Sequence, residues 1–242
     1  MSLLNRVIEN KNILGGFSTR WGGVSKTPFN DFNLAFHVDD NKNDVRQNRK
    51  LLTRELEIES QNIAWMNQVH SDNIEIVEGG GEVMETDGII AKQQDLALLV
   101  LVADCIPILF WDLKRKVVAV AHAGREGSYR NIAGKMIEKF KKEFNSNPTD
   151  IQVFLGPSIQ KECYEVGEDI VEAFRNKWGE KYIYQKTNLD LPTLNKDQLL
   201  KEGVLSENIS LSQICNHCDR NYFSYRREQK TGRFAGVVVL KI

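Results

Sequence analysis

The chain has 242 residues, of which 41% are hydrophobic and 27% are charged. This length allows one large domain or two small ones, and the apolar share is enough to bury a sizeable core. The formal net charge of -1 gives no electrostatic reason to expect nucleic acid or an anionic membrane as a partner, so a small polar or anionic molecule remains open.

The N-terminal third predicts a hairpin, one helix and several short strands. Residues 15–25 read GGFSTRWGGVS, which is typical of a turn-rich hairpin at a sheet edge. A helix is predicted from a cap at Asn43 or Asp44 to about Leu56. Its apolar residues share one face, and its basic residues are expected outside: Arg46, Arg49, Lys50 and Arg54. Short strands are predicted at 63–69, 74–76 and 85–90, with a glycine break at 79–81.

The centre of the chain is its most apolar part. Residues 96–103 are continuously apolar, a run too short for a membrane span and too uniform for a half-exposed strand. It therefore predicts a strand buried on both faces. Further apolar runs follow at 108–111 and 117–121, separated by a charged turn. The first of these three strands leads into Cys105 and the last into His122, so a thiol and an imidazole are expected at the ends of neighbouring strands.

The C-terminal part alternates helices and strands. An amphipathic helix is predicted over 129–144, just past His122, and its first-turn amides would offer an anion site. A buried strand at 151–155, helices at 168–178 and 194–201 and a final strand at 236–240 complete the pattern. Because no repeat or linker interrupts the sequence, we predict one α/β domain over residues 1–242, with a mixed central sheet flanked by helices.

Cysteine usage and the N-terminus favour the cytosol. Residues 1–17 lack the charged, apolar and small-residue sections of a secretory signal, and no apolar run approaches the ~18 residues of a membrane helix. The chain has four cysteines, too few and too scattered for a disulfide framework at this length. We expect a cytoplasmic protein with free thiols or a metal site, and no membrane or nucleic-acid partner.

Three side chains predict a metal centre. His70, like Cys105 and His122, follows an apolar strand. One thiolate and two imidazoles match the ligand set of catalytic zinc, which keeps a further position open. Copper is the alternative ion, because copper(II) outcompetes zinc at most sites with nitrogen and sulfur ligands. The pair Cys215 and Cys218 resembles half of a structural zinc site, but no second pair is evident, so we interpret it as structural.

The same residues support a second chemistry. Cys105 as a nucleophile, with His122 as its base, would suit a cysteine hydrolase or amidase. The two interpretations exclude each other in one state of the protein, because a thiolate bound to zinc is a poor nucleophile.

Several separate motifs, taken in order, resemble one family over nearly the whole chain. The motifs are Ser18–Arg20, Gly22–Ser25, Asn33–Leu34, Gln68–His70, Thr86–Gly88, Ala103–Pro107, His122–Gly124, Gly156–Ile159, Cys163–Gly167, Leu189–Leu191, Phe223–Arg227 and Thr231–Arg233. Together they are similar to the YfiH family, whose members are also called laccase-domain or multicopper polyphenol oxidase proteins and peptidoglycan editing factor.

The resemblance implies a single α/β domain similar to the catalytic domain of cytotoxic necrotizing factor. It also implies a zinc ion bound by His70, Cys105 and His122. Family members are described as enzymes that phosphorolyse adenosine, inosine or methylthioadenosine and that deaminate adenosine. A bacterial relative instead removes a wrong amino acid from a nucleotide-linked cell-wall precursor.

Two features bear on these activities. The family usually reads HAGWRG where this chain has His122-Ala123-Gly124-Arg125-Glu126-Gly127, so a carboxylate stands where an arginine is expected. If that arginine binds phosphate, Glu126 would repel it, and Arg125 or another arginine would have to compensate. The oxidase name requires a type 1 copper and a three-copper cluster, which together use far more histidines than the four in this chain.

We therefore expect a zinc-dependent enzyme whose substrates are purine nucleosides and phosphate. Asp87 or Asp104 is the candidate proton shuttle beside a zinc-activated water in deamination. The alternative for Asp104 is a strand-end residue that orients a ligand. Further candidates are expected to line the substrate pocket: Arg20, Asn33, Tyr164, Glu165, Ser224, Arg226 and Arg233.

Three alternatives remain open. The first is a thiol amidase that acts on nucleotide-linked peptidoglycan precursors through Cys105 and His122. The second is a polyphenol oxidase with a single copper ion. The third is a non-catalytic partner of the cell-division or envelope machinery with a structural metal, for which Cys105→Ala would disturb folding or binding and no reaction rate.

Overall fold

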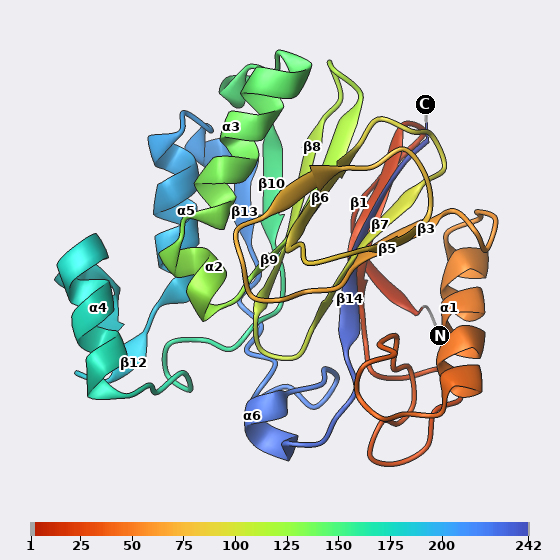
Figure 1. Ribbon diagram of the computed structural model, residues 1–242, viewed down its shortest axis with the longest axis horizontal. Coiled ribbons are helices and arrows are strands. Elements are labelled where there is room, and N and C mark those ends of the chain that lie inside the picture. Colours follow the sequence, from red (N-terminus) through yellow and green to blue (C-terminus); the bar gives the residue numbers. More distant parts are fainter. Residues whose placement is uncertain (1–2, 242) are drawn as a thin grey trace.

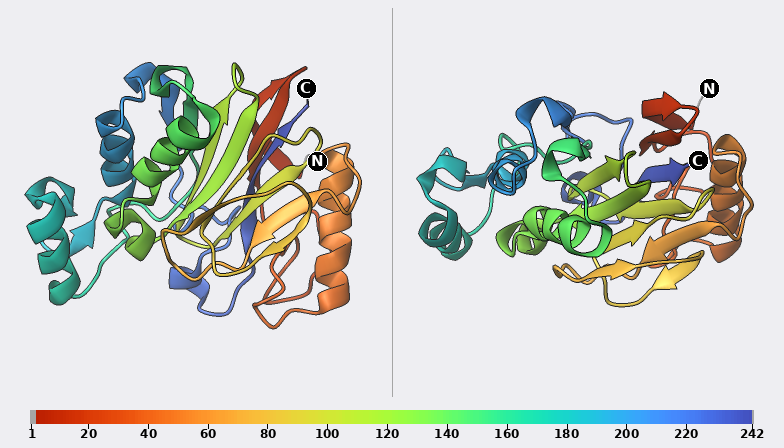
Figure 2. Two further views of the ribbon diagram at one scale, coloured as in Figure 1. Left: turned by 45° about the horizontal axis from the view of Figure 1, so that its top comes forward. Right: turned by 90° about the horizontal axis from the view of Figure 1, so that it is seen from above.

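The computed structural model describes residues 3–241, in which two six-stranded sheets lie face to face between outer layers of helices. Helix α1 (Lys42–Glu55) covers the outer face of the first sheet (Figure 1). Helices α3 (Ile132–Phe144) and α5 (Leu191–Lys201) cover the outer face of the second. The same layers are visible from above in Figure 2. An α/β fold with mixed sheets was expected, but the single central sheet of the prediction is two stacked sheets.

The first sheet contains the most apolar strand of the chain at an interior position. Its order is β1 (Leu4–Asn10), β2 (Ile13–Ser18), β14 (Phe234–Leu240), β7 (Ala97–Val102), β3 (Ile63–Met66) and β5 (Gly81–Val83). Strand β7 runs antiparallel to β14 and parallel to β3. Each of its residues is buried, as predicted for a strand covered on both faces.

The second sheet positions most of the candidate site. Its order is β13 (Ile209–Leu211), β10 (Gln152–Leu155), β8 (Ile106–Asp112), β9 (Val117–Ala123), β6 (Gly88–Ala91) and β4 (Ile74–Ile76). Strands β8 and β9 form an antiparallel hairpin in which Pro107 lies opposite His122. A two-stranded ribbon, β11 (Ile183–Tyr184) with β12 (Asn188–Leu189), lies outside both sheets.

Three apolar clusters fill the spaces between the four layers. Val100 of β7 and Val120 of β9 belong to the cluster between the two sheets. Leu99, the neighbour of Val100 in β7, points to the opposite face and packs in the cluster under α1. The neighbour of Val120, Ala121, belongs to the cluster under α3 and α5. Two covered faces per sheet explain why these strands are uniformly apolar.

Two predictions for the N-terminal part need correction. The segment that begins at Gly15 is not at a sheet edge, because β2 is paired on both sides and β1 is the edge strand. Helix α1 is capped by Asn41, two or three residues earlier than expected. Arg49 is not outside: it is buried, its guanidinium stacks on Phe36 and Trp65, and its Nε donates to the carbonyl of Leu34.

The helix predicted over 129–144 begins three residues later than expected, and a separate short helix precedes it. A short α2 (Arg125–Tyr129) follows β9, and α3 begins only at Ile132. Asn131 separates them with a left-handed φ of 68° and caps α3 through its own side chain. An anion site was expected in the first turn of this helix, where the Asn131 side chain already accepts a hydrogen bond from the Gly134 amide.

The remaining helices have the predicted bounds, begin earlier than predicted or were not predicted. Helix α4 (Glu168–Trp178) has the predicted bounds, and α5 begins three residues earlier than expected, with Pro192 in its first turn. A short helix, α6 (Tyr225–Glu228), was not predicted. Within residues 3–241, no helix is long and apolar enough to span a membrane.

Candidate functional site

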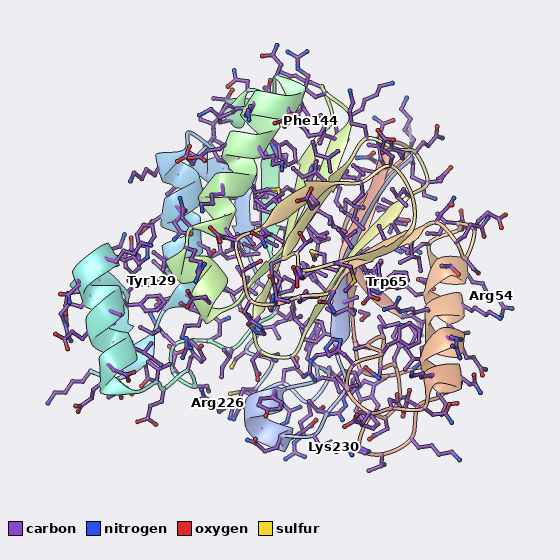
Figure 3. All side chains as sticks on the ribbon, in the orientation of Figure 1. Arg54, Trp65, Tyr129, Phe144, Arg226 and Lys230 are labelled. Atoms are coloured by element: carbon purple, nitrogen blue, oxygen red, sulfur yellow. The ribbon has the colours of Figure 1, made fainter. Side chains whose placement is uncertain are left out.

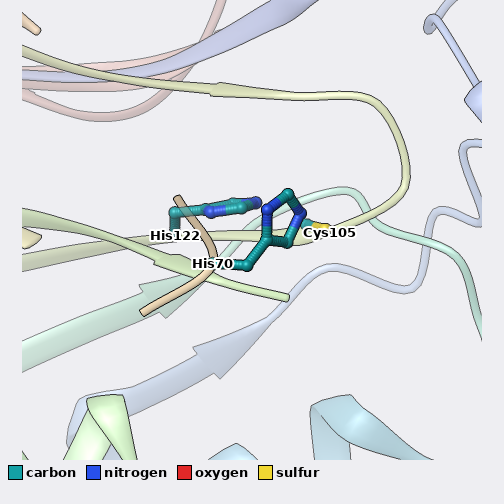
Figure 4. Close-up of side chains that lie close together, drawn as sticks. All are labelled: His70, Cys105 and His122. Atoms are coloured by element: carbon teal, nitrogen blue, oxygen red, sulfur yellow. The ribbon is translucent and has the colours of Figure 1, made fainter. Parts of the chain in front are cut away.

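Two loops and the end of strand β9 bring His70, Cys105 and His122 together (Figure 4). His70 follows β3, Cys105 lies in the turn from β7 to β8, and His122 is on β9. Their candidate ligand atoms lie within 4.8 Å of one another. In Figure 4 both imidazole rings point toward the sulfur. The predicted cluster therefore forms, although its members are 35 and 17 residues apart in the chain.

The backbone fixes both of these loops in unusual conformations. His70 has a φ of 59° and Asp104, beside Cys105, has a φ of 103°. Both values are uncommon for residues with a side chain, and such conformations persist only where the surroundings impose them. Gln68 imposes part of this geometry: its side-chain amide pairs with both backbone groups of Leu101, at 2.9 and 3.0 Å, after β3 has ended.

Asp87 holds His122 and the His70 loop from behind. Its Oδ1 lies 2.7 Å from Nδ1 of His122, and its carboxylate accepts hydrogen bonds from the amides of Val69, His70 and Ser71. The side chain of Asp87 is fully buried and does not line the cavity described below. This position differs from that expected of a proton shuttle, and it makes Asp87 a positioning residue for two candidate ligands.

The three donors fit a metal ion sterically and electrostatically. A Cβ at Gly124 would lie 3.0 Å from Cys105 Sγ and 3.1 Å from His70 Cδ2, so the glycine leaves open the space beside the donors. Burial opposes ionisation of Cys105, but the charge and hydrogen bond of His122 outweigh it and lower the thiol pKa to about 6. Burial likewise opposes protonation of His122, but the Cys105 thiolate and Asp87 raise its pKa to about 9. A thiolate with two imidazoles suits zinc or copper, and the ion is not fixed by this set.

A cavity of about 580 Å³ opens in front of the cluster. This volume is within the range of small-molecule sites. The lining residues are His37, Gln68, His70, Leu101, Val102, Ala103, Asp104, Cys105, His122, Ile159, Tyr164, Tyr225, Arg226 and Arg233. The candidate ligands therefore face a space that a small molecule can enter.

Two arginines and two tyrosines form the polar wall of the cavity. The Arg226 guanidinium lies over the Tyr164 ring at 5.4 Å, and that of Arg233 over the Tyr225 ring at 5.8 Å. Burial and the negative charge of Cys105 raise the pKa of Tyr164 to about 12, so its hydroxyl is a proton donor at neutral pH. Burial lowers the pKa of Arg233, which remains a cation at neutral pH.

Asp104 lines the cavity, but its carboxylate is already bound by the loop that carries Arg226. It accepts hydrogen bonds from Ser224 Oγ at 2.6 Å, the Arg226 amide at 2.7 Å and the Asn216 side chain at 3.0 Å. Asp104 thus holds the start of α6 against the metal-ligand loop. This geometry favours the ligand-orienting alternative for Asp104 over the proton shuttle.

Four of the expected pocket residues do not line the cavity. Arg20 is buried in an ion pair with Glu228 at 2.6 Å. Asn33 is buried and accepts a hydrogen bond from the Arg233 amide, so it positions a lining residue. Ser224 holds Asp104 and caps α6, while Glu165 is exposed and its carbonyl accepts from Arg226. Arg20 therefore lies outside the cavity lining, whereas Asn33, Ser224 and Glu165 contact residues that belong to it.

Sequence reasoning missed the lining side chains of His37, Gln68 and Tyr225, besides the apolar lining residues Leu101, Val102, Ala103 and Ile159. Gln68 and Tyr225 lie within motifs that were quoted for the resemblance, but no spacing distinguishes His37, Gln68 or Tyr225 from a surface residue. Glu126, which was expected to repel phosphate, pairs with Arg130 at 2.6 Å, and neither Arg125 nor Glu126 lines the cavity.

An α/β/β/α protein with a His-Cys-His cluster beside a small-molecule cavity combines candidate metal ligands with a candidate substrate site. The sequence profile described as multi-copper polyphenol oxidoreductase laccase matches residues 15–241. The chain belongs to this laccase-like family, which includes the YfiH proteins.

Relatives and solved structures agree over nearly the whole chain. The purine nucleoside phosphorylase YlmD of Bacillus subtilis is 32% identical, over 96% of this chain and 90% of its own length. A purine nucleoside phosphorylase of Corynebacterium glutamicum is 36% identical over 96% of both chains. The structure of a Bacillus licheniformis hypothetical protein YfiH has a TM-score of 0.90 and 31% identity, and covers 95% of this chain and 93% of its own. The structure of YlmD from Geobacillus stearothermophilus also has a TM-score of 0.90, with 30% identity. The match covers 96% of this chain and 93% of that one.

Proposed function

We propose that this protein is a cytosolic, zinc-dependent purine nucleoside phosphorylase that cleaves adenosine, inosine or methylthioadenosine. The observation that carries the proposal is that Arg226, Arg233 and the three candidate metal ligands line one cavity. The names of the relatives from Bacillus subtilis and Corynebacterium glutamicum supply the reaction class.

In the proposed reaction, an oxygen of hydrogen phosphate attacks C1′ of the nucleoside. The bond between C1′ and the purine nitrogen breaks, and the purine takes the electron pair and the proton of the phosphate. The second product is ribose 1-phosphate, or its 5′-methylthio derivative when the substrate is methylthioadenosine. Arg226 and Arg233 would hold the phosphate, because guanidinium groups bind phosphate oxygens by paired hydrogen bonds. The half-exposed ring of Tyr225 offers a stacking surface for the purine.

The protonated Tyr164 would donate a hydrogen bond to phosphate or to a ribose hydroxyl. Bound at His70, Cys105 and His122, zinc would supply a Lewis acid that stabilises negative charge on a ligand atom. Asp87 would keep His122 in the tautomer whose Nε2 is free for the metal. We propose that the same cavity deaminates adenosine, with water replacing the amino group at C6 and ammonia leaving.

The test is metal analysis of the purified protein, followed by a nucleoside panel with and without phosphate. Base release from inosine should require phosphate and should be lost in His122→Ala, while adenosine should also yield inosine without phosphate. Phosphate-independent release of base, or unchanged turnover in His122→Ala, contradicts the proposal.

The phosphate site has a matched control. Arg226→Met should raise the KM for phosphate about tenfold or more, because one charge-assisted pair contributes at least ~1.4 kcal/mol. Arg54→Met, on α1 and distant from α6 in Figure 3, should leave this KM unchanged. A similar KM in both variants would remove Arg226 from the phosphate site.

A second function is favoured by one specific contact. The chain Cys105–His122–Asp87 has the order of a nucleophile, a base and an orienting carboxylate, with the His122 to Asp87 distance at 2.7 Å. A metal-free thiol amidase on nucleotide-linked peptidoglycan precursors is therefore the alternative. It predicts precursor cleavage that zinc inhibits and Cys105→Ser abolishes, whereas the phosphorylase predicts activation by zinc.

A further inference from the structure

A second cluster of metal-ligating side chains lies outside the cavity. Candidate ligand atoms of Cys163, His217 and Cys218 lie within 4.8 Å of one another. Cys215 joins them, because its thiol interacts by hydrogen bonds with those of Cys163 and Cys218. From the sequence, the pair Cys215 and Cys218 was interpreted as structural, because no further metal-ligating residues were evident near it. In the fold, Cys163 and His217 lie beside this pair.

We propose that Cys163, Cys215, Cys218 and His217 form a second metal site that takes a thiolate-preferring divalent cation such as zinc. Three thiolates and one imidazole are a ligand set of structural zinc, and the spacing Cys-x-x-Cys is typical of such sites. This site is distinct from the His-Cys-His cluster and needs none of its residues.

Distances within the cluster fit a shared ion. Cys163 Sγ and Cys218 Sγ are 3.4 Å apart, well beyond the ~2.05 Å of a disulfide bond. Two sulfurs on a tetrahedral zinc, each about 2.3 Å from the ion, are separated by about 3.8 Å. A small adjustment of either side chain would therefore allow both thiolates to bind the same ion.

The surroundings already stabilise the ligand geometry. Backbone amides of Gln160, His217 and Cys218 donate to the Cys215 sulfur, and the Cys218 amide also donates to the Cys215 carbonyl at 3.1 Å. Nδ1 of His217 is buried and has no hydrogen-bond partner among residues 3–241. A buried ring nitrogen without a hydrogen-bond partner costs free energy of folding. A cation bound between this nitrogen and the sulfurs would remove that cost.

Arg227 stiffens the loop that carries three of the four ligands. Its guanidinium donates to the carbonyls of Asn216, His217 and Tyr222 at 2.7–2.8 Å. The fourth ligand, Cys163, comes from a different loop, between β10 and α4.

The site therefore connects two loops that leave neighbouring strands, β10 and β13 (Figure 1). The first loop carries Tyr164, next to Cys163, and the second leads into α6 with Arg226. Both Tyr164 and Arg226 line the cavity. An ion at the second site would hold these two walls of the cavity at a fixed separation.

The test is the zinc content of protein prepared under reducing conditions, measured by elemental analysis after gel filtration. Wild type should bind two equivalents. The variant Cys163→Ser/Cys218→Ser should lose one, the variant His70→Ala/Cys105→Ser should lose the other, and the combined variant should bind none. Circular dichroism of each variant confirms folding.

Cobalt(II) provides an independent measurement of which site is lost. Sulfur-to-cobalt absorption depends on the number of thiolate ligands, so the ion left in His70→Ala/Cys105→Ser should absorb about three times as strongly as that left in Cys163→Ser/Cys218→Ser. A single equivalent in reduced wild type that Cys163→Ser/Cys218→Ser retains, or two equivalents in Cys163→Ser/Cys218→Ser, overturns the proposal, whereas a single equivalent that only this variant loses would leave the His-Cys-His cluster empty. A disulfide that reforms between these cysteines in place of metal binding also overturns it.

Discussion

Adding one methyl group at Gly124 should weaken metal binding at the His-Cys-His cluster without unfolding the protein. Gly124 has a φ of -75° and a ψ of -174°, a conformation that alanine adopts freely. The new Cβ would lie 3.0 Å from Cys105 Sγ and 3.1 Å from His70 Cδ2. The methyl group would therefore push on two ligands rather than strain the backbone.

The magnitude follows from the crowding. Overpacking at a tight contact costs about 1–3 kcal/mol. The ligands must move away from the methyl group to bind the ion, so this cost weakens metal binding. A cost of ~1.4 kcal/mol corresponds to a tenfold change in the Kd. We expect Gly124→Ala to raise the Kd for zinc roughly 5- to 100-fold.

A competition titration with a chromophoric chelator measures this effect in the Cys163→Ser/Cys218→Ser background, so that only one site is observed. Gly15→Ala is the matched control, because its Cβ would meet Ile8 Cγ2 at the same 3.0 Å, in β2 and away from the cluster. It should lower the free energy of unfolding and leave the Kd unchanged. Equal zinc affinity in Gly124→Ala and wild type would refute the geometry of this cluster.

Three further predictions test the residues around the site and the fold. Asp87→Asn should raise the Kd for zinc roughly 10- to 100-fold in the same titration, because the orienting partner of His122 is lost; an unchanged Kd would make Asp87 merely structural. In metal-free protein, Cys105 should react with iodoacetamide more slowly as the pH falls through about 6, since its lowered pKa keeps the thiolate present above that pH. Peptide mapping follows the alkylation of Cys105. A rate that changes near pH ~9, the ordinary range of a thiol, contradicts this prediction, and bound zinc should protect the thiol. Arg49→Ala should lower the free energy of unfolding in urea by about 2 kcal/mol, because the buried guanidinium loses two aromatic contacts. Arg46→Ala, on the exposed face of α1, should change it by less than about 0.5 kcal/mol, and equal losses would refute the role of burial.

Local patterns determined the elements of the chain well. The apolar run at 96–103 became β7, with every residue buried, and the helix at 168–178 has its predicted bounds. These patterns succeed because burial on both faces of a strand, or on one face of a helix, selects residue types at a fixed period. The motifs around Gln68, Cys105 and His122 were also sufficient to identify the family.

Sequence alone did not determine which faces and loops meet. Arg49 was expected in solvent because it is charged, but the loop at residues 34–36 folds over α1 and supplies a carbonyl and an aromatic ring. Asp87 was a candidate proton shuttle until the pairing of β6 with β9 placed it behind His122.

Only the tertiary structure decided the composition of the second candidate metal cluster. Cys163 is 52 to 55 positions away from Cys215 and Cys218 in the chain, and no local period connects them. They meet because β13 pairs in parallel with β10, which brings the loops after both strands to the same end of the sheet. Strand pairing is decided by the packing of whole sheets, so the residues that form a site can be named in advance, but their meeting point depends on the complete fold.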